Sequence, residues 1–239
     1  MTDSPRSRDG QDVALAYQGF REAILQGDFR PGEIMTQQQI VERLGISRTP
    51  LREAIRILQH EGLLNAEPHR RLQVADFSVE DVESVYVMRV LLECAAVRVT
   101  VPALLPKHIA EMKGFMAQMD HFSEPDLARE WEVPHRAFHA VLVSRAGARM
   151  TATIRQLSDH AERYRRVYLA TAASTYAISG SEHEAILASA SEGDSEQAAL
   201  LLAHHYLRTA GHVIHLIDPA HETAQLNLAV RLVGDPSFE

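Results

Sequence analysis

The sequence predicts a mainly α-helical protein, made of an N-terminal winged helix-turn-helix and a C-terminal all-α antiparallel helical bundle. Apolar residues recur at helical spacing along most of the chain, strand-like patterns are confined to the stretch before residue 77, and short breaks with Pro or Gly separate the helical segments. We therefore expect four parts: a flexible N-terminus at residues 1–12, a winged helix-turn-helix at 13–77, a helical domain at 78–217 and a C-terminal tail at 218–239.

The first two helices of the winged unit are predicted from periodicity and end signals. Residues 13–27, VALAYQGFREAILQG, are helical in pattern and end at a glycine, and the turn FRPGE follows. Thr36 and Gln39 have the three-residue spacing of a capping box. We therefore expect a second helix from Thr36 to about Arg43.

The segment 44–64, LGISRTPLREAIRILQHEGLL, predicts a third helix over about residues 49–61. Ser47 can cap this helix through its hydroxyl. Arg48 and Arg52 are four residues apart and share one face, while apolar residues on the other face would hold the helix to a core. This is the form of a recognition helix that enters the major groove of DNA.

A hairpin is expected directly after these helices. The stretch LLNAEPHRRLQVADF, residues 63–77, predicts two short strands around a turn that contains Pro68. Three helices followed by such a hairpin make a winged helix-turn-helix.

From Ser78 onwards the pattern is almost continuously helical, and no strand pattern remains. The short breaks between these segments favour antiparallel neighbours. The expected helices lie near residues 78–101, 105–121, 126–145, 148–172, 177–191 and 194–216, with one more in the tail at 221–233.

Composition narrows the class of protein. Hydrophobic residues make up 46% of the 239 residues, which is enough for a substantial core. The sequence contains no run of about 18 apolar residues, so it predicts no membrane span. The polar N-terminus lacks the apolar stretch of a signal peptide. Cys94 is the single cysteine, so it is expected to be a buried small hydrophobe rather than half of a disulfide. We therefore expect a cytoplasmic protein with no membrane partner.

The net charge of −8 does not favour nonspecific binding to nucleic acid. Residues 1–77 contain ten Arg, no Lys and eleven Asp or Glu, so most of the excess negative charge lies in the second part of the chain. Any contact with DNA must therefore come from local clusters of arginine.

The histidines form a second informative pattern. His135 and His139 are four residues apart on a predicted helix, so both rings project from one face. His183 lies on a later helix, and His204 and His205 lie on the last long helix. Three helices of a bundle could thus converge on one interior point and offer imidazole ligands to a divalent metal.

These segments resemble the GntR family of transcription regulators, in its FadR-type subgroup with a C-terminal FCD domain. The resemblance covers about residues 13–217 and is most specific in FRPGE and LGISRTPLREAIRILQHEGLL. In the second half, the runs VYVMRVLLECAA, HRAFHAVLV and EHEAILASASEGDSEQAALLLAHHYL resemble FCD helices in the same order.

The resemblance implies which residues contact DNA. Arg48 and Arg52 match arginines that contact DNA in the family, where Arg can bond to guanine, and the residues beside them match positions near phosphates. Gln38 stands where the family has a further arginine, and Arg71 stands where the tip of the wing usually has glycine. The implied set is Gln38, Ser47, Arg48, Thr49, Arg52, His69, Arg70 and Arg71.

Many FCD domains bind a divalent metal through one Asp and three His. The matching residues here are His135, His139, His183 and His205, and the resemblance favours His205 over His204 because its spacing from His183 fits the family without a gap. His135 occupies the usual Asp position, which keeps a ligand suited to zinc or nickel but removes one negative charge. The alternative is a degenerate site that holds no metal.

Arg89 matches an arginine that lines the effector pocket of the family, where a guanidinium beside a metal would suit a carboxylate. Its alternative role is a structural salt bridge to Glu93, one helical turn further on.

Together these features predict a DNA-binding transcriptional regulator, a repressor rather than an enzyme. It would act as a homodimer on a palindromic operator and respond to a small organic acid bound in the metal-containing helical domain. Two alternatives stay open. The metal itself could be the effector, or the histidine site could belong to a metalloenzyme, although neither Glu132 nor Glu182 forms a recognisable catalytic motif.

Overall fold

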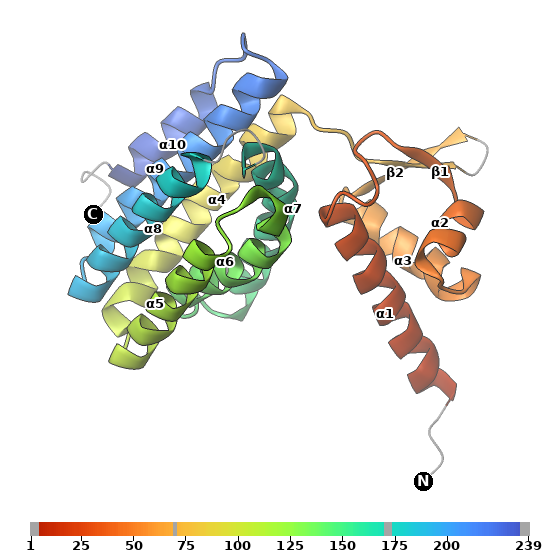
Figure 1. Cartoon of the computed structure of the whole chain (residues 1–239), viewed down its shortest axis with the longest axis horizontal. Helices are drawn as coiled ribbons and strands as arrows, with labels where there is room; N and C mark the ends of the chain where they lie inside the picture. Colours follow the sequence, from red (N-terminus) through yellow and green to blue (C-terminus); the bar gives the residue numbers. More distant parts are fainter. Residues whose placement is uncertain (1–4, 69–70, 170–173, 235–239) are drawn as a thin grey trace. The chain divides into compact units, whose positions relative to one another are not determined.

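The computed structural model describes residues 5–68, 71–169 and 174–234 of the chain. The chain forms two compact units, Met1–Phe77 and Ser78–Glu239 (Figure 1). The division lies at the position that the sequence predicts for the end of the winged unit.

The first unit combines three helices with a small antiparallel sheet (Figure 1). Strand β3 is central in the sheet, with β1 on one side and β2 on the other. Strands β2 and β3 are the expected wing, whereas β1 is too short to show an alternating pattern in the sequence. The elements are α1 Pro5–Leu25, β1 Ile34–Thr36, α2 Gln37–Leu44, α3 Arg48–His60, β2 Leu64–Glu67 and β3 Arg71–Val74.

Two expectations about this unit are wrong in detail. Helix α1 begins at Pro5, so the first helix starts eight residues before the expected residue 13. Ser47 has the extended backbone of an N-cap residue, but its side chain makes no capping hydrogen bond.

The capping box of α2 is confirmed, because the Thr36 hydroxyl accepts from the Gln39 N–H and the Gln39 side chain accepts from the Thr36 N–H.

An apolar core joins the three helices of the first unit to its sheet. The rings of Phe20 and Phe29 are buried and pack edge to face, with centroids 5.0 Å apart. The opposite face of α3 is left to solvent, because its apolar stripe points into this core. That stripe consists of Leu51, Ala54, Ile55 and Leu58.

The second unit is a bundle of helices (Figure 1). Helix α4 packs against α7, α9 and α10, so it is the central element of the unit. Cys94 on α4 is buried as expected, with its thiol 3.3 Å from the backbone oxygen of Ala199 on α9. The elements are α4 Val79–Thr100, η2 Val101–Ala103, α5 Pro106–His121, η3 Pro125–Leu127, α6 Ala128–Leu142, α7 Ala148–Leu169, α8 Ser174–Glu192, α9 Ser195–Ile217 and α10 Ala224–Gly234.

The segment expected to be a separate C-terminal tail is part of this bundle. Helix α10 packs against α4 and α9. The buried carboxylate of Glu83 on α4 accepts hydrogen bonds from the backbone N–H groups of Gln225 and Leu226 in the first turn of α10, and it lies 2.9 Å from Nε2 of His221. A carboxylate in this position satisfies N–H groups that the helix itself leaves unpaired.

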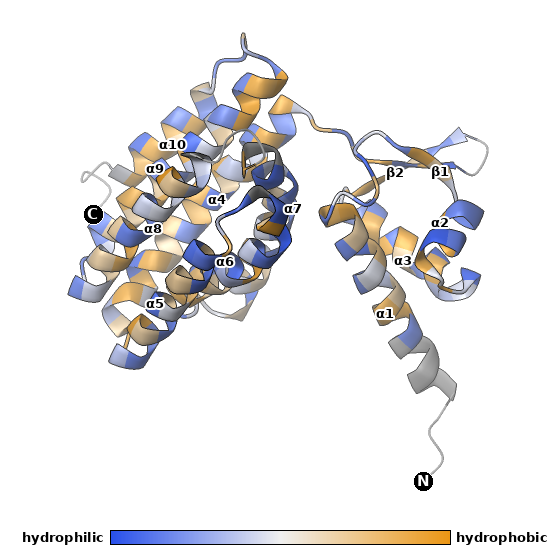
Figure 2. Cartoon of the chain, viewed as in Figure 1, coloured by the Kyte–Doolittle hydropathy of each residue, from blue (hydrophilic) through white to orange (hydrophobic). Residues whose placement is uncertain are grey.

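Hydrophobic and hydrophilic residues alternate along the helices of both units (Figure 2). This amphipathic pattern is the one expected when a single face of each helix packs on a core. Among the described helices, none combines the length and the hydropathy that a membrane span requires.

The capping box of α2 gives a test of the winged unit. Thr36→Ala should lower the free energy of unfolding of this unit by about 1 kcal/mol, because α2 would lose a capping hydrogen bond. Thr49→Ala is the control, since this residue is exposed in the first turn of α3, and its effect should stay within about 0.5 kcal/mol. Urea denaturation of the full-length chain measures both. Equal effects would show that the capping box does not stabilise α2.

Candidate functional site

Four buried histidines from three helices of the second unit meet at one point. His135 and His139 lie one turn apart on α6, His183 lies on α8 and His205 lies on α9. One ring nitrogen of each lies within 4.8 Å of the others, and no residue of the four is more than 4% exposed. The structure therefore brings together the four histidines predicted as ligands, whereas His204 is exposed.

Hydrogen bonds at the outer nitrogens orient the rings. Nδ1 of His183 lies 2.6 Å from the backbone oxygen of Ser179, and Nδ1 of His205 lies 2.9 Å from Oε2 of Glu182. The Nε2 atoms of His139 and His183 are 3.1 Å apart. Outer partners of this kind fix the tautomer of an imidazole and leave its other nitrogen free to bind a metal.

His135 differs from the other three, because neither of its buried ring nitrogens has a hydrogen-bond partner. The ring stacks on Trp131 with centroids 4.5 Å apart, and Nδ1 lies 3.5 Å from Oε1 of Glu132. Pro134 lies inside α6 without ending the helix. Buried polar atoms are almost always paired, so an unpaired imidazole beside three others fits a ligand for a metal ion.

Burial keeps this cluster uncharged. It lowers the pKa of His183 and His205 to about 3, and it lowers the pKa of His135 and His139 well below the usual range. The nearby positive charge of Arg165 acts in the same direction on three of these rings. Neutral imidazole is the form that binds metal, and four nitrogen donors suit zinc or nickel.

Arg89 on α4 is buried and already has two partners. Its Nε donates to Oε1 of Glu93 at 2.7 Å, and its Nη2 donates to the hydroxyl oxygen of Tyr206 at 2.7 Å. The Tyr206 hydroxyl also lies 3.2 Å from Nδ1 of His139. The salt bridge to Glu93 is therefore present, and Tyr206 connects it to the histidine cluster.

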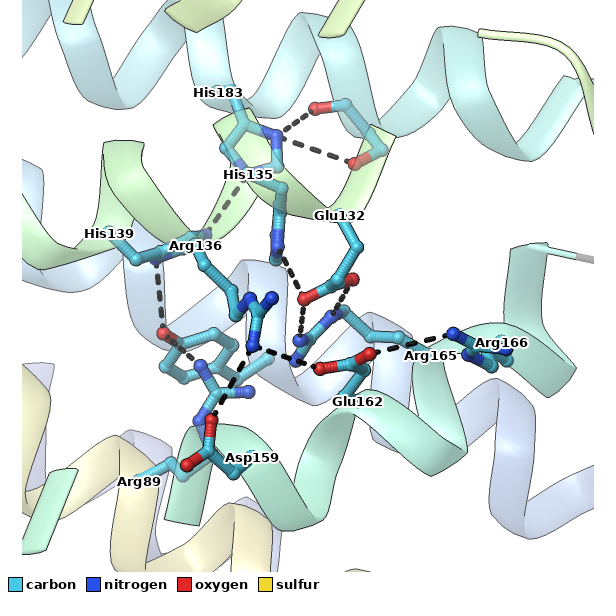
Figure 3. Close-up of polar contacts among 12 residues, drawn as sticks. Arg89, Glu132, His135, Arg136, His139, Asp159, Glu162, Arg165, Arg166 and His183 are labelled. Atoms are coloured by element: carbon cyan, nitrogen blue, oxygen red, sulfur yellow. Dashed lines mark hydrogen bonds and ion pairs between the residues drawn. The ribbon is translucent and has the colours of Figure 1, made fainter. Parts of the chain in front are cut away.

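A second set of buried charges borders the cluster (Figure 3). Arg165 on α7 binds the carboxylate of Glu132 through Nε, at 3.2 Å, and through Nη2. The carboxylate of Glu162 lies between Arg136 and Arg166, with a nitrogen–oxygen distance of 3.5 Å to each. Burial raises the pKa of Glu162, and the negative charge of Glu132 raises it further.

A cavity of about 530 Å³ lies beside the cluster, between α5, α6 and α8. Trp131 and His183 form part of its wall, together with Met116, Met119 and Tyr176. The cavity therefore reaches one side of the histidine site through a lining that mixes aromatic and apolar side chains with polar ones, among them Asp120 and Glu184.

The first unit presents predicted DNA-contacting side chains on α2 and α3. Arg48 and Arg52 are exposed near the start of α3, and Nη2 of Arg48 lies 2.5 Å from Oε1 of Gln38 on α2. The side chain of Arg52 is 63% exposed and lies 3.7 Å from Glu53. Polar side chains grouped in this way at the start of a recognition helix can reach base edges in a major groove.

The remaining predicted DNA contacts lie at the N-terminal end of α3 and in the wing. Ser47 and Thr49 are exposed where α3 begins, a position that suits phosphate. Arg71 is exposed at the first position of β3. His69 and Arg70 lie outside the described residues.

Sequence reasoning did not identify Tyr206 and Arg165 as neighbours of the histidine cluster. Arg165 belongs to the charged run ERYRR, which has the composition of an exposed helix face. Tyr206 follows His205 directly, but adjacent residues on a helix point about 100° apart. Both residues contact helices that are distant in the sequence, and such contacts leave no pattern in the sequence from which Tyr206 and Arg165 could have been predicted.

Comparison with known families matches both units. Residues 84–208 match the FCD domain, which is more than half of the chain, and residues 14–74 match the gntR family of bacterial regulatory proteins.

Individual proteins are similar to this chain over one unit or over both. The uncharacterized HTH-type transcriptional regulator YdhC of Bacillus subtilis is 34% identical over 85 residues, which is 36% of this chain and 38% of that protein. The HTH-type transcriptional repressor GlaR of Escherichia coli is 24% identical over 199 residues, which is 80% of this chain and 90% of that protein. The solved structure of McbR/YncC of Escherichia coli shares the fold, with a TM-score of 0.76 at 20% identity over 87% of this chain and 99% of that one.

The pairing of Arg89 with Glu93 gives a test of the helical unit. Arg89→Met should lower the free energy of unfolding by about 3–5 kcal/mol, because it leaves the Glu93 carboxylate buried without its cationic partner. The double variant Arg89→Met with Glu93→Leu should recover most of this loss, since no buried charge remains. Thermal and chemical denaturation measure both variants. A loss below about 1 kcal/mol for the single variant would contradict a structural role for the pair.

Proposed function

The chain belongs to the gntR family of bacterial regulatory proteins and carries an FCD domain. From this premise we propose that it is a homodimeric repressor. Its affinity for the operator is controlled by a small organic acid that binds beside a divalent metal. The chain is a transcriptional regulator, as its relatives are, and not an enzyme. A repressor among these relatives supports the repressing role.

The observation that carries this proposal is the exposed group of Gln38, Arg48 and Arg52 on a helix pair held by a buried core. Arginine can donate two hydrogen bonds to the edge of guanine, and glutamine can pair with adenine. Because the whole chain has a net charge of −8, attraction to DNA must come from such local contacts. Binding should weaken as salt increases.

An unpartnered apolar stripe on α4 supports a homodimer. From Ser84 onwards, the exposed positions of α4 fall three or four residues apart and so lie on one face. Within that stripe, Met88 and Leu91 are each 43% exposed and Val99 is 59% exposed. The small residue Ser84 precedes them, and Ala95 lies between Leu91 and Val99. A second copy packing on this stripe would bury it and would supply the second winged unit that a palindromic operator requires.

The donor chemistry supports a metal at the four histidines. His135, His139, His183 and His205 are buried, uncharged and close enough to share one ion. When bound, zinc or nickel would supply a positive centre, and a metal that expands beyond four ligands would take an oxygen ligand from an anion. Ser179, Glu182 and Tyr206 would hold three of the rings in position.

The charge of such a site favours an acidic effector. Four neutral imidazoles leave the two positive charges of the metal uncompensated, and burying uncompensated charge is costly. A carboxylate would offset part of that charge. Arg89 donates to the hydroxyl of Tyr206, which in turn lies beside His139. The role of Arg89 in effector binding stays a prediction.

Control of DNA binding requires that the effector binds more tightly to one arrangement of the dimer than to the other. We place the effector in the helical unit because the histidines and the adjoining cavity both lie there.

A metal sensor is the second candidate. The observation that favours it is that four protein nitrogens can complete a tetrahedral site without any further ligand. If adding and removing zinc alone switched DNA binding at fixed protein concentration, this candidate would replace the organic-acid regulator.

The DNA-binding surface is tested by Arg52→Ala. The loss of one arginine that reaches a base should weaken binding about 5- to 150-fold, the equivalent of about 1–3 kcal/mol. The probe is a duplex selected from a random-sequence library by the protein itself, and binding is followed by fluorescence anisotropy. Arg155→Ala is the control, because it removes the same charge from an exposed site on α7. If the selected duplexes contained no palindromic sequence, this would contradict the proposal that a homodimer binds two half-sites of an operator.

The metal site is tested by His139→Ala in protein purified without an affinity tag. Mass spectrometry of metals should find about one zinc or nickel per wild-type chain and a large loss in the variant, because one of four ligands is gone. His204→Ala is the matched control, since His204 is exposed beside His205. Occupancy below about half in the wild type, unchanged in His139→Ala, would count against the site.

A further inference from the structure

Two hydrogen bonds in series join three exposed polar side chains of α2 and α3. Nε2 of Gln38 donates to Oε1 of Glu42 at 2.7 Å, and Nη2 of Arg48 donates to Oε1 of Gln38 at 2.5 Å. The first bond joins side chains one turn apart on α2, and the second connects α3 to α2. The side-chain amide of Gln38 is therefore bound on both sides by groups of the protein itself.

The two partners fix the orientation of the Gln38 amide. A guanidinium can only donate hydrogen bonds, and an ionised carboxylate can only accept them. The amide oxygen must therefore face Arg48 and the amide nitrogen must face Glu42, since the flipped amide would place donor against donor and acceptor against acceptor. A glutamine that recognises adenine uses its oxygen and its nitrogen together. In this structure both atoms already have a partner in the protein.

Arg48 keeps most of its donors for DNA. A guanidinium has five N–H bonds, and the contact with Gln38 uses one of them. The others suffice for the two hydrogen bonds by which an arginine recognises guanine. Arg48 is also the first residue of α3, at the end of a recognition helix that meets the base edges. The contact with Gln38 limits the directions in which this long side chain can point, so less conformational entropy is lost when it binds.

Arg52, one turn further along α3, is not held in this way. Its Nε lies 3.7 Å from Oε1 of Glu53, which is too long for a hydrogen bond. The Glu53 carboxylate accepts instead from Nη1 of Arg56, at 3.1 Å to each of its oxygens. The helix therefore presents one arginine in a fixed direction and one without such a hold, which provides an internal comparison.

We propose that Gln38 is a positioning residue, which directs Arg48 toward a guanine and does not itself recognise a base. Glu42 holds the Gln38 amide in the orientation that this role requires. The inference rests on the DNA-binding surface of the proposed function, and it adds which residue of that surface recognises the base and which one directs it. It does not depend on the metal or on the effector.

The test is a double-mutant cycle on DNA specificity, made with the full-length chain. The probe is a duplex that the wild-type protein selects from a random-sequence library, together with duplexes in which each base pair is changed in turn. Gln38→Met removes both amide groups at the same side-chain length, and Arg48→Met removes the guanidinium. Gln37→Met is the matched control, because Gln37 is exposed on the same turn of α2 but points about 100° away from Gln38.

The two variants should act on the same base pair. Arg48→Met should reduce the preference for guanine there about 5- to 150-fold. Gln38→Met should reduce it about 2- to 10-fold, the effect of one hydrogen bond, and should have no further effect once Arg48 is replaced. Combined with Arg52→Ala, in contrast, the effect of Gln38→Met should multiply, because Arg52 does not depend on Gln38. Gln37→Met should keep the wild-type preference at every base pair.

Gln38→Glu separates the positioning of Arg48 from the recognition of a base. Its carboxylate still offers Arg48 an acceptor, so the preference for guanine should remain, while the added negative charge weakens binding to all sequences alike. If Gln38 recognised adenine, this variant would instead lose that preference and favour cytosine at the same base pair, since a carboxylate accepts from the cytosine amino group.

Three results would overturn the inference. The first is a change in Gln38→Met at a base pair that Arg48→Met leaves unaltered, which would make Gln38 a base-recognising residue. The second is a multiplicative effect of Gln38→Met and Arg48→Met, which would show that they act independently. The third is a wild-type base preference in Gln38→Met. All the substituted residues are exposed, so the thermal unfolding midpoints should match that of the wild type and specificity can be compared directly.

Failure of the inference and failure of the proposed function give different results. If neither Arg48→Met nor Arg52→Ala weakened binding to the selected duplex, the DNA-binding surface would be wrong and the inference with it. If Arg48→Met abolished the preference for guanine while Gln38→Met behaved as the wild type, the surface would stand and only the role of Gln38 would be wrong.

Discussion

Burial allows four histidines to share one small volume, and the chemistry of the helical unit depends on this constraint. An imidazolium there would have to leave water and repel its neighbours, so the rings stay neutral and keep their nitrogens available as donors. Arginine cannot lose its charge in the same way. The buried Arg89 and Arg165 are therefore each paired with a carboxylate, Glu93 and Glu132 respectively. Both of these buried arginines are thus matched by a carboxylate within hydrogen-bonding distance.

The winged unit uses its charges in the opposite manner. Its arginines at the start of α3 lie in solvent, and their nearest partners are a glutamine amide and a surface glutamate rather than buried carboxylates. Exposed contacts of this kind contribute little free energy, so exchanging them for contacts with DNA would cost little. Because the apolar stripe of α3 is held by a closed core, the helix can present these side chains in a fixed direction without being stabilised by them.

Much of the fold could be predicted from the sequence, because periodicity and end signals act within one helix. The helices of both units lie close to their expected bounds, while β1 and the start of α1 were missed, since three residues show no alternation and residues 5–12 carry few apolar residues. The histidines were found through the i, i+4 pair and the family resemblance. Tyr206 and Arg165 were not, because a contact between distant helices leaves no periodic trace in either one.

Helix α4 connects features that have been described separately. It starts directly after the boundary at Ser78, it carries Arg89 beside the histidine site, and its outer face holds the apolar stripe. From Arg89 to its first residue, Val79, the helix runs about 15 Å without a break. As a rigid rod, it would convert a tilt of about 5° at Arg89 into a displacement of about 1.3 Å at its first residue. A displacement transmitted in this way does not require a series of side chains to rearrange. Any regulation that used it would depend on the stiffness of α4.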